Sequence, residues 1–227
     1  MRQSNLADAL KDILAKIVAT LREKGFKGSG QNYRHATDVA VSVVNFQKSS
    51  GGERFYVNVG VQPLFVPTES ESAPDAKTIK EPECIFRRRL DPPMDDLFGW
   101  PYSTDISADL AQRFGQLYVS FIVPLMTIPG PITDAIVSDF RPDSAHLLFG
   151  SRHARNFLHL ARILLAMGNC GRAAEFATAA IEICPPHAST LHYHLKQVLA
   201  KTTIAAKGDA TEPSDAPKSP VGRNFDA

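Results

Sequence analysis

The sequence has little net charge and no long apolar run, and both absences exclude a class of protein. There are 25 Lys and Arg residues against 24 Asp and Glu, and the resulting net charge of +1 exerts no global attraction toward nucleic acid or anionic lipid. Residues 117–128 come nearest to a membrane span, but this stretch is too short and contains Pro124. We therefore expect no membrane partner, and we consider nucleic acid an improbable partner.

Cysteine is also scarce. Cys84, Cys170 and Cys184 are odd in number, widely spaced and free of any C-x-x-C pair. This usage favours a reducing compartment over a disulfide framework. The N-terminal segment carries charges every few residues, unlike the apolar centre of a signal peptide. A cytoplasmic location is the expectation.

The residues that are present indicate an α+β fold. Apolar residues recur at helical spacing over residues 6–21, and Gly25 suits the turn that ends this helix. Residues 32–35, 38–47 and 54–66 alternate and are rich in Val, Phe and Tyr, which predicts strands. We expect an N-terminal helix packed on a small antiparallel sheet, followed by a helical C-terminal region and a disordered tail.

The strands at 38–47 and 54–66 form a hairpin in this prediction. A turn over residues 48–53 pairs Gln47 with Arg54, so that Phe46 faces Phe55. One face of the sheet is then apolar and is covered by the first helix. The other face carries four polar side chains flanked by two basic ones, and together they are the candidate binding residues: Asn45, Gln47, Tyr56, Asn58, Lys48 and Arg54.

The rest of the chain reads as loop, strand and helices. A solvated loop over 67–82 precedes a strand at 84–90, and a helix runs from about residue 105 until Pro124 disrupts it. Short helices are expected near 133–140 and 143–149. Residues 152–202 have the spacing of a tetratricopeptide-like helical hairpin with a third helix over 187–199. The predicted units are residues 1–105, residues 106–203 and a disordered tail, 204–227.

Three short motifs occur in an order that is familiar: Gly25-Phe26-Lys27-Gly28-x-Gly30, Asn45-x-Gln47-Lys48-Ser49 and Phe55-Tyr56-Val57-Asn58-Val59-Gly60. Over residues 8–105 the chain resembles a bacterial family of domains of unknown function, DUF4304. Members typically have a helix ending in a GFKK-type turn, an N-x-Q-x-S strand and a strand ending N-x-G. This chain differs in having Gly28 where lysine is common, and in its helical extension. The family has no established activity, so the resemblance implies a fold and no function.

The polar face suits recognition better than proton transfer. Neutral amides and a phenol supply directional donors and acceptors without a titrating group. The alternative is that these amides only satisfy neighbouring backbone groups. The basic residues of the N-terminal half, which include Lys27 and Arg34, could instead meet a phosphate backbone. The run Arg87-Arg88-Arg89 is interpreted as forming salt bridges with nearby acids such as Glu81.

Motifs for catalysis and for metal binding are missing. No G-x-S-x-G, H-E-x-x-H or Cys/His ligand spacing occurs, and Gly28-Ser29-Gly30 opens onto a strand instead of a helix. We predict no catalytic residue, no metal ligand and no cofactor, which favours a protein that is not an enzyme.

The leading hypothesis is therefore a protein-interaction module, with immunity or regulatory proteins as possible forms, whose partner is another protein. One alternative is an enzyme or small-ligand binder with a pocket between the sheet and the C-terminal helices. A weaker alternative is RNA binding by the basic N-terminal half.

Overall fold

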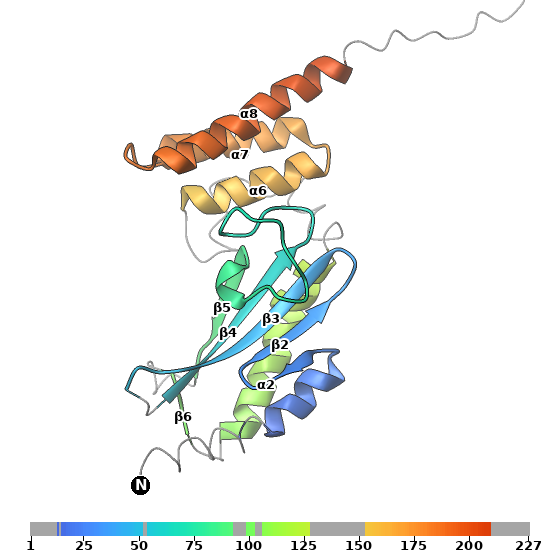
Figure 1. Cartoon of the computed structure of the whole chain (residues 1–227), viewed down its shortest axis with the longest axis vertical. Coiled ribbons are helices and arrows are strands. Elements are labelled where there is room, and N and C mark those ends of the chain that lie inside the picture. Colours follow the sequence, from blue (N-terminus) through green and yellow to red (C-terminus); the bar gives the residue numbers. More distant parts are fainter. Residues whose placement is uncertain are drawn as a thin grey trace, which may run out of the picture.

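The computed structural model describes the chain over the following residues: 13, 15–51, 54–92, 99–102, 106–127 and 153–209. A sheet lies at the centre, helices cover its back, and three further helices stack beyond one end (Figure 1). This is the α+β architecture that the sequence predicts. The short helices expected between 133 and 149, and tail residues 210–227, lie outside the described residues.

All pairings in the sheet are antiparallel, and five of its six strands follow the order β1-β2-β3-β4-β5 while β6 pairs with β4. The strands are β1 (Lys27–Ser29), β2 (Asn32–Ala36), β3 (Ala40–Lys48), β4 (Arg54–Pro63), β5 (Phe86–Leu90) and β6 (Trp100–Pro101). A loop over residues 64–85, hereafter the 64–85 loop, connects β4 to β5 and contains the short 3₁₀ helix η1 (Glu81–Glu83).

The β3–β4 register differs by two residues from the predicted one. Gln47 pairs with Tyr56 instead of Arg54, and Phe46 faces Val57 instead of Phe55. The reason is a tighter turn: the Ser49 amide donates to the Arg54 carbonyl at 2.9 Å, and the Ser49 hydroxyl accepts from the Arg54 amide at 3.2 Å. These bonds place Ser49 opposite Arg54, so the turn between the strands is shorter than predicted. Because the shift is even, the side chains of the two predicted strands stay on their predicted faces.

The main core lies on one face of this sheet. Val44, Phe46 and Val57 are buried there against Ile17 of the first helix and Phe114 of α2. The described part of the first helix covers residues 13 and 15–23, and α2 (Ser107–Leu117) crosses behind the strands (Figure 1). The prediction that the first helix covers the apolar face is thus confirmed, and α2 shares the task.

Pro124 does not end the helical segment, which corrects the prediction. A π-helical turn, η3 (Tyr118–Ile122), separates α2 from α3 (Val123–Met126), and Pro124 lies in the first turn of α3. A proline there has no intrahelical amide to lose, and the wider π turn before it accommodates the ring.

Three C-terminal helices form a second core. They are α6 (Ala154–Ala166), α7 (Cys170–Ile183) and α8 (Ser189–Asp209). Ala173, Ala177 and Ala180 are fully buried with Leu160 and Leu164, so small side chains let the helices approach closely. The third helix extends to Asp209, well past its predicted end. No helix within the described ranges is long and apolar enough to cross a membrane.

Candidate functional site

The face of the sheet opposite the main core is polar at one end. Asn45 pairs with Asn58 and Gln47 pairs with Tyr56, so these four side chains share this face. Strand β5 adds Arg89, which lies opposite Asn58 in the ladder. We call these five residues the open polar patch: Asn45, Gln47, Tyr56, Asn58 and Arg89.

Contacts within the open polar patch fix its side chains. The Asn58 amide donates to the Gln47 side-chain oxygen at 3.1 Å, and the Arg89 Nε donates to Asn58 Oδ1 at 3.2 Å. The guanidinium of Arg89 lies over the Tyr56 ring, 4.4 Å from its centroid. At the margin, Asn45 donates to Asn32 Oδ1 at 2.8 Å. Gln47, Asn58, Arg89 and Tyr56 are therefore connected by direct contacts, and Arg89 and Gln47 remain exposed to solvent.

The two basic residues predicted to flank this patch have other positions. Lys48 pairs with Phe55, so it lies on the opposite face, at the exposed end of β3. Arg54 shares the face of Tyr56, but its guanidinium donates to the Gly99 carbonyl at 3.0 Å. Gly99 packs so closely against the Tyr56 ring that a Cβ there would lie 2.7 Å from Cε1. Arg54 thus buttresses Tyr56 through Gly99.

The other end of the same face is covered by the 64–85 loop. Val41 and Val43 pack against Ile79 and Cys84 of this loop in a small separate core. Gly60 permits the contact, because a Cβ at this position would lie 2.7 Å from both Cβ and Sγ of Cys84. The glycine of the Asn58-x-Gly60 motif therefore has a packing role.

Gln62 shows what burial requires of an amide on this face. Its side chain is fully buried and accepts the Ile85 amide at 3.1 Å. Its Nε2 donates to the carbonyls of Pro63 and Val66 at 2.9 and 3.0 Å, with a longer contact to Pro67. Gln62 is a structural residue that holds both ends of the 64–85 loop.

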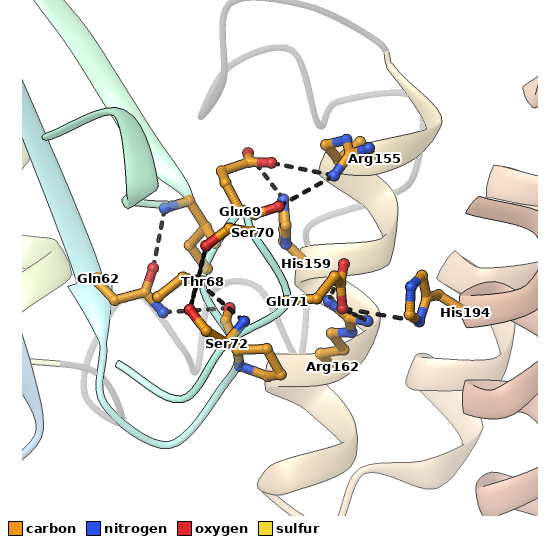
Figure 2. Close-up of polar contacts among 12 residues, drawn as sticks. Gln62, Thr68, Glu69, Ser70, Glu71, Ser72, Arg155, His159, Arg162 and His194 are labelled. Atoms are coloured by element: carbon orange, nitrogen blue, oxygen red, sulfur yellow. Dashed lines mark hydrogen bonds and ion pairs between the residues drawn. The ribbon is translucent and has the colours of Figure 1, made fainter. Parts of the chain in front are cut away.

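The outer side of the 64–85 loop is attached to the C-terminal helices by ion pairs (Figure 2). Glu69 accepts from His159 Nε2 at 3.0 Å and approaches Arg155 at 3.4 Å. Glu71 binds the guanidinium of Arg162 through both oxygens, at 3.1 and 2.6 Å. We call these contacts between the loop and α6 the loop–helix junction.

The electrostatics of the junction favour the ionised carboxylate. Burial alone raises the pKa of Glu69, but the His159 hydrogen bond and the positive charges of His159, Arg155 and Arg87 outweigh it, so that the pKa is lowered. Glu71 has a positive φ of 63°, an unusual conformation for a residue other than glycine. The bidentate Arg162 contact and His194 at 3.7 Å accompany this conformation.

A cavity of about 410 Å³ lies beside the junction. Phe65, Val66 and Pro67 form its wall on the sheet side, and α6 and α8 contribute Arg162 and Lys201 among others. The cavity lies between the sheet domain and the C-terminal helices. The ligand-binding alternative predicts a pocket in this position. Tyr56 and Asn58 are not among the residues that line it.

The described residues contain no group of three or more His, Cys, Asp and Glu that could hold a metal ion. All three cysteines are free, and burial raises the pKa of Cys84 and of Cys184. A thiol with a raised pKa is a poor nucleophile. These two cysteines are packing residues in the small core under the loop and in the second core.

Sequence reasoning missed Arg89, Glu69 and His159 as members of polar networks. The salt-bridge interpretation of the arginine run holds for Arg87, which contacts Glu81 at 2.7 Å. Within the described residues, Arg89 contacts Asn58, its ladder partner, and the ring of Tyr56; Asp95 and Asp96, two of the acids considered as partners, lie outside the described residues. Alternation along β5 separates Arg87 and Arg89 from Arg88, but only the β4–β5 register reveals which residue each one meets.

The structure thus defines an α+β domain with a helix-covered antiparallel sheet and a separate helical unit. Residues 17–122 match the model of the family described as a domain of unknown function, DUF4304, and this segment belongs to that family. The match includes the sheet, the 64–85 loop and α2, and it excludes α6 to α8. Comparisons with curated proteins and with solved structures found no match.

Proposed function

We propose that this chain is a protein-interaction module whose docking surface is the open polar patch. The observation that carries the proposal is the position of Arg89. Its guanidinium is stacked on Tyr56 and tied by Nε to Asn58, while its side chain stays exposed. An arginine held in this way presents its remaining donors in a fixed direction.

Preorganisation favours binding at such a patch. Ordering a flexible side chain on association costs about 0.5–1.5 kcal/mol. Stacking on Tyr56 and the bond to Asn58 meet part of that cost in the free protein. Tyrosine and arginine are also the side chains that most often dominate the energy of protein interfaces.

The chemistry of the patch favours a partner with a carboxylate at the point of contact. Within the described part of the chain, the recorded partners of Arg89 are an amide oxygen and an aromatic ring, and neither neutralises its charge. A guanidinium with free edge donors binds a carboxylate in a bidentate manner. Gln47 and Asn45 add neutral donors and acceptors at the margin, which suits a polar segment of a protein.

The test is comparative capture from a lysate of the source organism. Wild-type chain, Tyr56→Ala and Arg89→Gln are immobilised, and captured proteins are quantified by mass spectrometry. We expect one or more proteins to be retained by the wild type and reduced at least tenfold by both variants, because loss of an interface anchor costs about 2 kcal/mol or more.

Lys48→Gln is the matched control, because it removes one positive charge from the adjacent strand end on the opposite face. A partner reduced by Arg89→Gln but kept by Lys48→Gln supports the proposal. Equal retention by all four proteins, with equal melting temperatures, contradicts it. A captured regulated enzyme or toxin would place the module among regulatory or immunity proteins, respectively.

A second candidate function is binding of a small ligand in the cavity beside the loop–helix junction. The observation that favours it is the composition of that cavity: apolar side chains such as Leu165 and Val198 face Lys201 and the Arg162–Glu71 pair. Because Glu71 neutralises Arg162, Lys201 is left to attract a single negative charge. A fatty or aromatic carboxylic acid fits this pattern, and Lys201→Gln should abolish any thermal stabilisation that such acids produce.

A further inference from the structure

A second hollow lies at the outer edge of the sheet and shares no lining residue with the cavity beside the loop–helix junction. It measures about 590 Å³, and its lining includes Gly25, Lys27, Arg34, His35, Ala36 and Lys77. Every lining side chain that carries a full charge is basic. We call it the basic edge pocket. Its size falls within the range of about 300–1,000 Å³ that is usual for small-molecule sites.

Two of the basic side chains are direct cross-strand neighbours. Lys27 on β1 pairs with Arg34 on β2, so both project from the same face of the sheet at adjacent positions. Like charges directly opposite each other destabilise an antiparallel pair. A bound anion between them would remove that repulsion, and this arrangement is the first sign of a ligand.

The groups that contact Arg34 and Lys77 leave this excess of positive charge in place. Arg34 donates to the carbonyls of Ile79 and Thr78 at 2.7 and 3.1 Å, which position its guanidinium without neutralising it. Asp75, whose pKa is lowered chiefly by hydrogen bonding from the Lys77 amide, accepts that bond at 2.9 Å and a second one from Thr78. Asp75 interacts electrostatically with Lys77 and Arg34, but its carboxylate is already engaged in these two hydrogen bonds.

The strand edge contributes neutral groups to the same hollow. The β1–β2 ladder ends at the Lys27–Arg34 pair, whereas β2 continues to Ala36. The Thr37 amide donates inward to the Ala40 carbonyl, so alternation turns the Ala36 N–H outward, toward the pocket. Gly25 adds space, because a Cβ there would lie 3.2 Å from Nε2 of His35.

We infer that the basic edge pocket binds a phosphate-bearing small molecule. Lys27 and Lys77 line it from two different elements, Arg34 is held by carbonyl contacts to the 64–85 loop, and Ala36 supplies a backbone donor. Three cationic side chains and the Asp75 carboxylate together leave a net charge of about +2, which balances the charge of about −2 on a phosphate monoester, and the cationic donors suit its several acceptor oxygens. Gly25, Lys27 and Gly28, at the turn that leads into β1, build one wall of this site.

The test titrates the full chain with inorganic phosphate and with pyrophosphate at low ionic strength. Binding is followed by calorimetry and by amide resonances of residues 25–36. We expect saturable shifts centred on Lys27 and Ala36. Lys27→Gln and Lys77→Gln should each weaken binding about tenfold, because each removes one charge-assisted contact.

Lys16→Gln is the control, since Lys16 is an exposed lysine on the first helix that does not line the pocket. It should leave the dissociation constant within about twofold. Lys27 and Lys77 are exposed and lie on separate elements, so failure of one variant to fold leaves the other as the test.

Three outcomes would overturn the inference. The first is the absence of saturable shifts at millimolar pyrophosphate. The second is equal weakening by Lys16→Gln, which would show diffuse charge attraction without a site. The third is binding of a short single-stranded RNA that depends equally on Lys48 and Arg54, with no binding of pyrophosphate. Because Lys16, Lys27 and Lys77 lie outside the open polar patch, the phosphate result is independent of the proposed docking function.

Discussion

The two ends of one sheet face differ although the same strands build them. At the covered end, under the 64–85 loop, Gln62 is fully buried and its amide has partners on both sides. At the open end, Gln47 is exposed and its oxygen accepts a bond from Asn58. A glutamine side chain thus holds the loop to the sheet at the covered end and forms part of the exposed surface at the open end.

The comparison shows that burial under the 64–85 loop decides whether a polar side chain on this face has a structural role. A buried amide must find partners or cost about 1–3 kcal/mol, so every contact of Gln62 contributes to the fold. An exposed amide exchanges protein partners for water at little cost. Gln47 and Arg89 therefore remain exposed to solvent. Four sets of variants can break or sharpen this contrast.

The largest effect is expected from Gln62→Ala at the covered end. The change leaves the Ile85 amide and loop carbonyls without partners and opens a small cavity, so the free energy of unfolding should fall by about 2–4 kcal/mol. Gln47→Ala at the open end is the matched variant and should cost less than about 1 kcal/mol. Urea denaturation of both variants measures the difference, and equal losses would refute the contrast.

The next effect concerns how the loop reaches the sheet. Gly60→Ala places a Cβ 2.7 Å from two Cys84 atoms and should cost about 1–3 kcal/mol by overpacking. In a Cys84→Gly background the same change should cost clearly less, because the clashing atoms are gone. Denaturation of the single and double variants completes the cycle. Strict additivity would mean that the close approach of loop and strand is not the cause.

The junction that secures the covering loop should respond to pH. The lowered pKa of Glu69 means that its stabilisation is present above the pKa of the unfolded chain and is lost as pH falls through the folded-state pKa. Wild type should therefore exceed Glu69→Gln in stability at pH 7, and the difference should shrink as pH falls below about 4. Glu23→Gln, at an exposed position on the first helix, provides the control titration. A difference that is constant with pH would exclude this role.

The smallest stability effect is expected from Arg89→Gln at the open end. Within the described residues, its contacts are one hydrogen bond and one ring contact at an exposed position, so the free energy of unfolding should change by less than about 1 kcal/mol. Partner capture should nevertheless be lost. If thermal and urea unfolding showed a large loss while capture persisted, Arg89 would belong to the fold and the docking proposal would fail.

Much of the fold was predictable because it depends on local patterns. The period of two places Phe46 and Asn45 on opposite faces in any even register, so the two-residue error in the hairpin left both faces correct. The error itself arose because the loop length could not be deduced from glycines alone. Pro124 was misjudged for a related reason: a proline in the first turn of a helix is tolerated, and the π turn before it has no sequence signal that we recognised.

The candidate site was predictable only in part. As expected, alternation places four polar residues on one face: Asn45, Gln47, Tyr56 and Asn58. Lys48 lies on the other face, because it is two residues after Phe46 on β3. Arg89 could not be included, since its neighbours depend on a pairing across a long intervening loop. Glu69 and Glu71 resembled solvated loop residues because their partners on α6 are about ninety positions away in the chain.

The sequence by itself determined which residues share a face, where the apolar stripe of the first helix lies and that small residues line the C-terminal helix pair, because these follow from local backbone geometry. Only the tertiary structure decided which end of the polar face is covered, that Arg89 lies on Tyr56, and that Lys27 and Arg34 border one hollow with Lys77. Those features depend on contacts between distant segments. Local geometry cannot specify such contacts, because they form only when the 64–85 loop docks on the sheet and the strand registers are set.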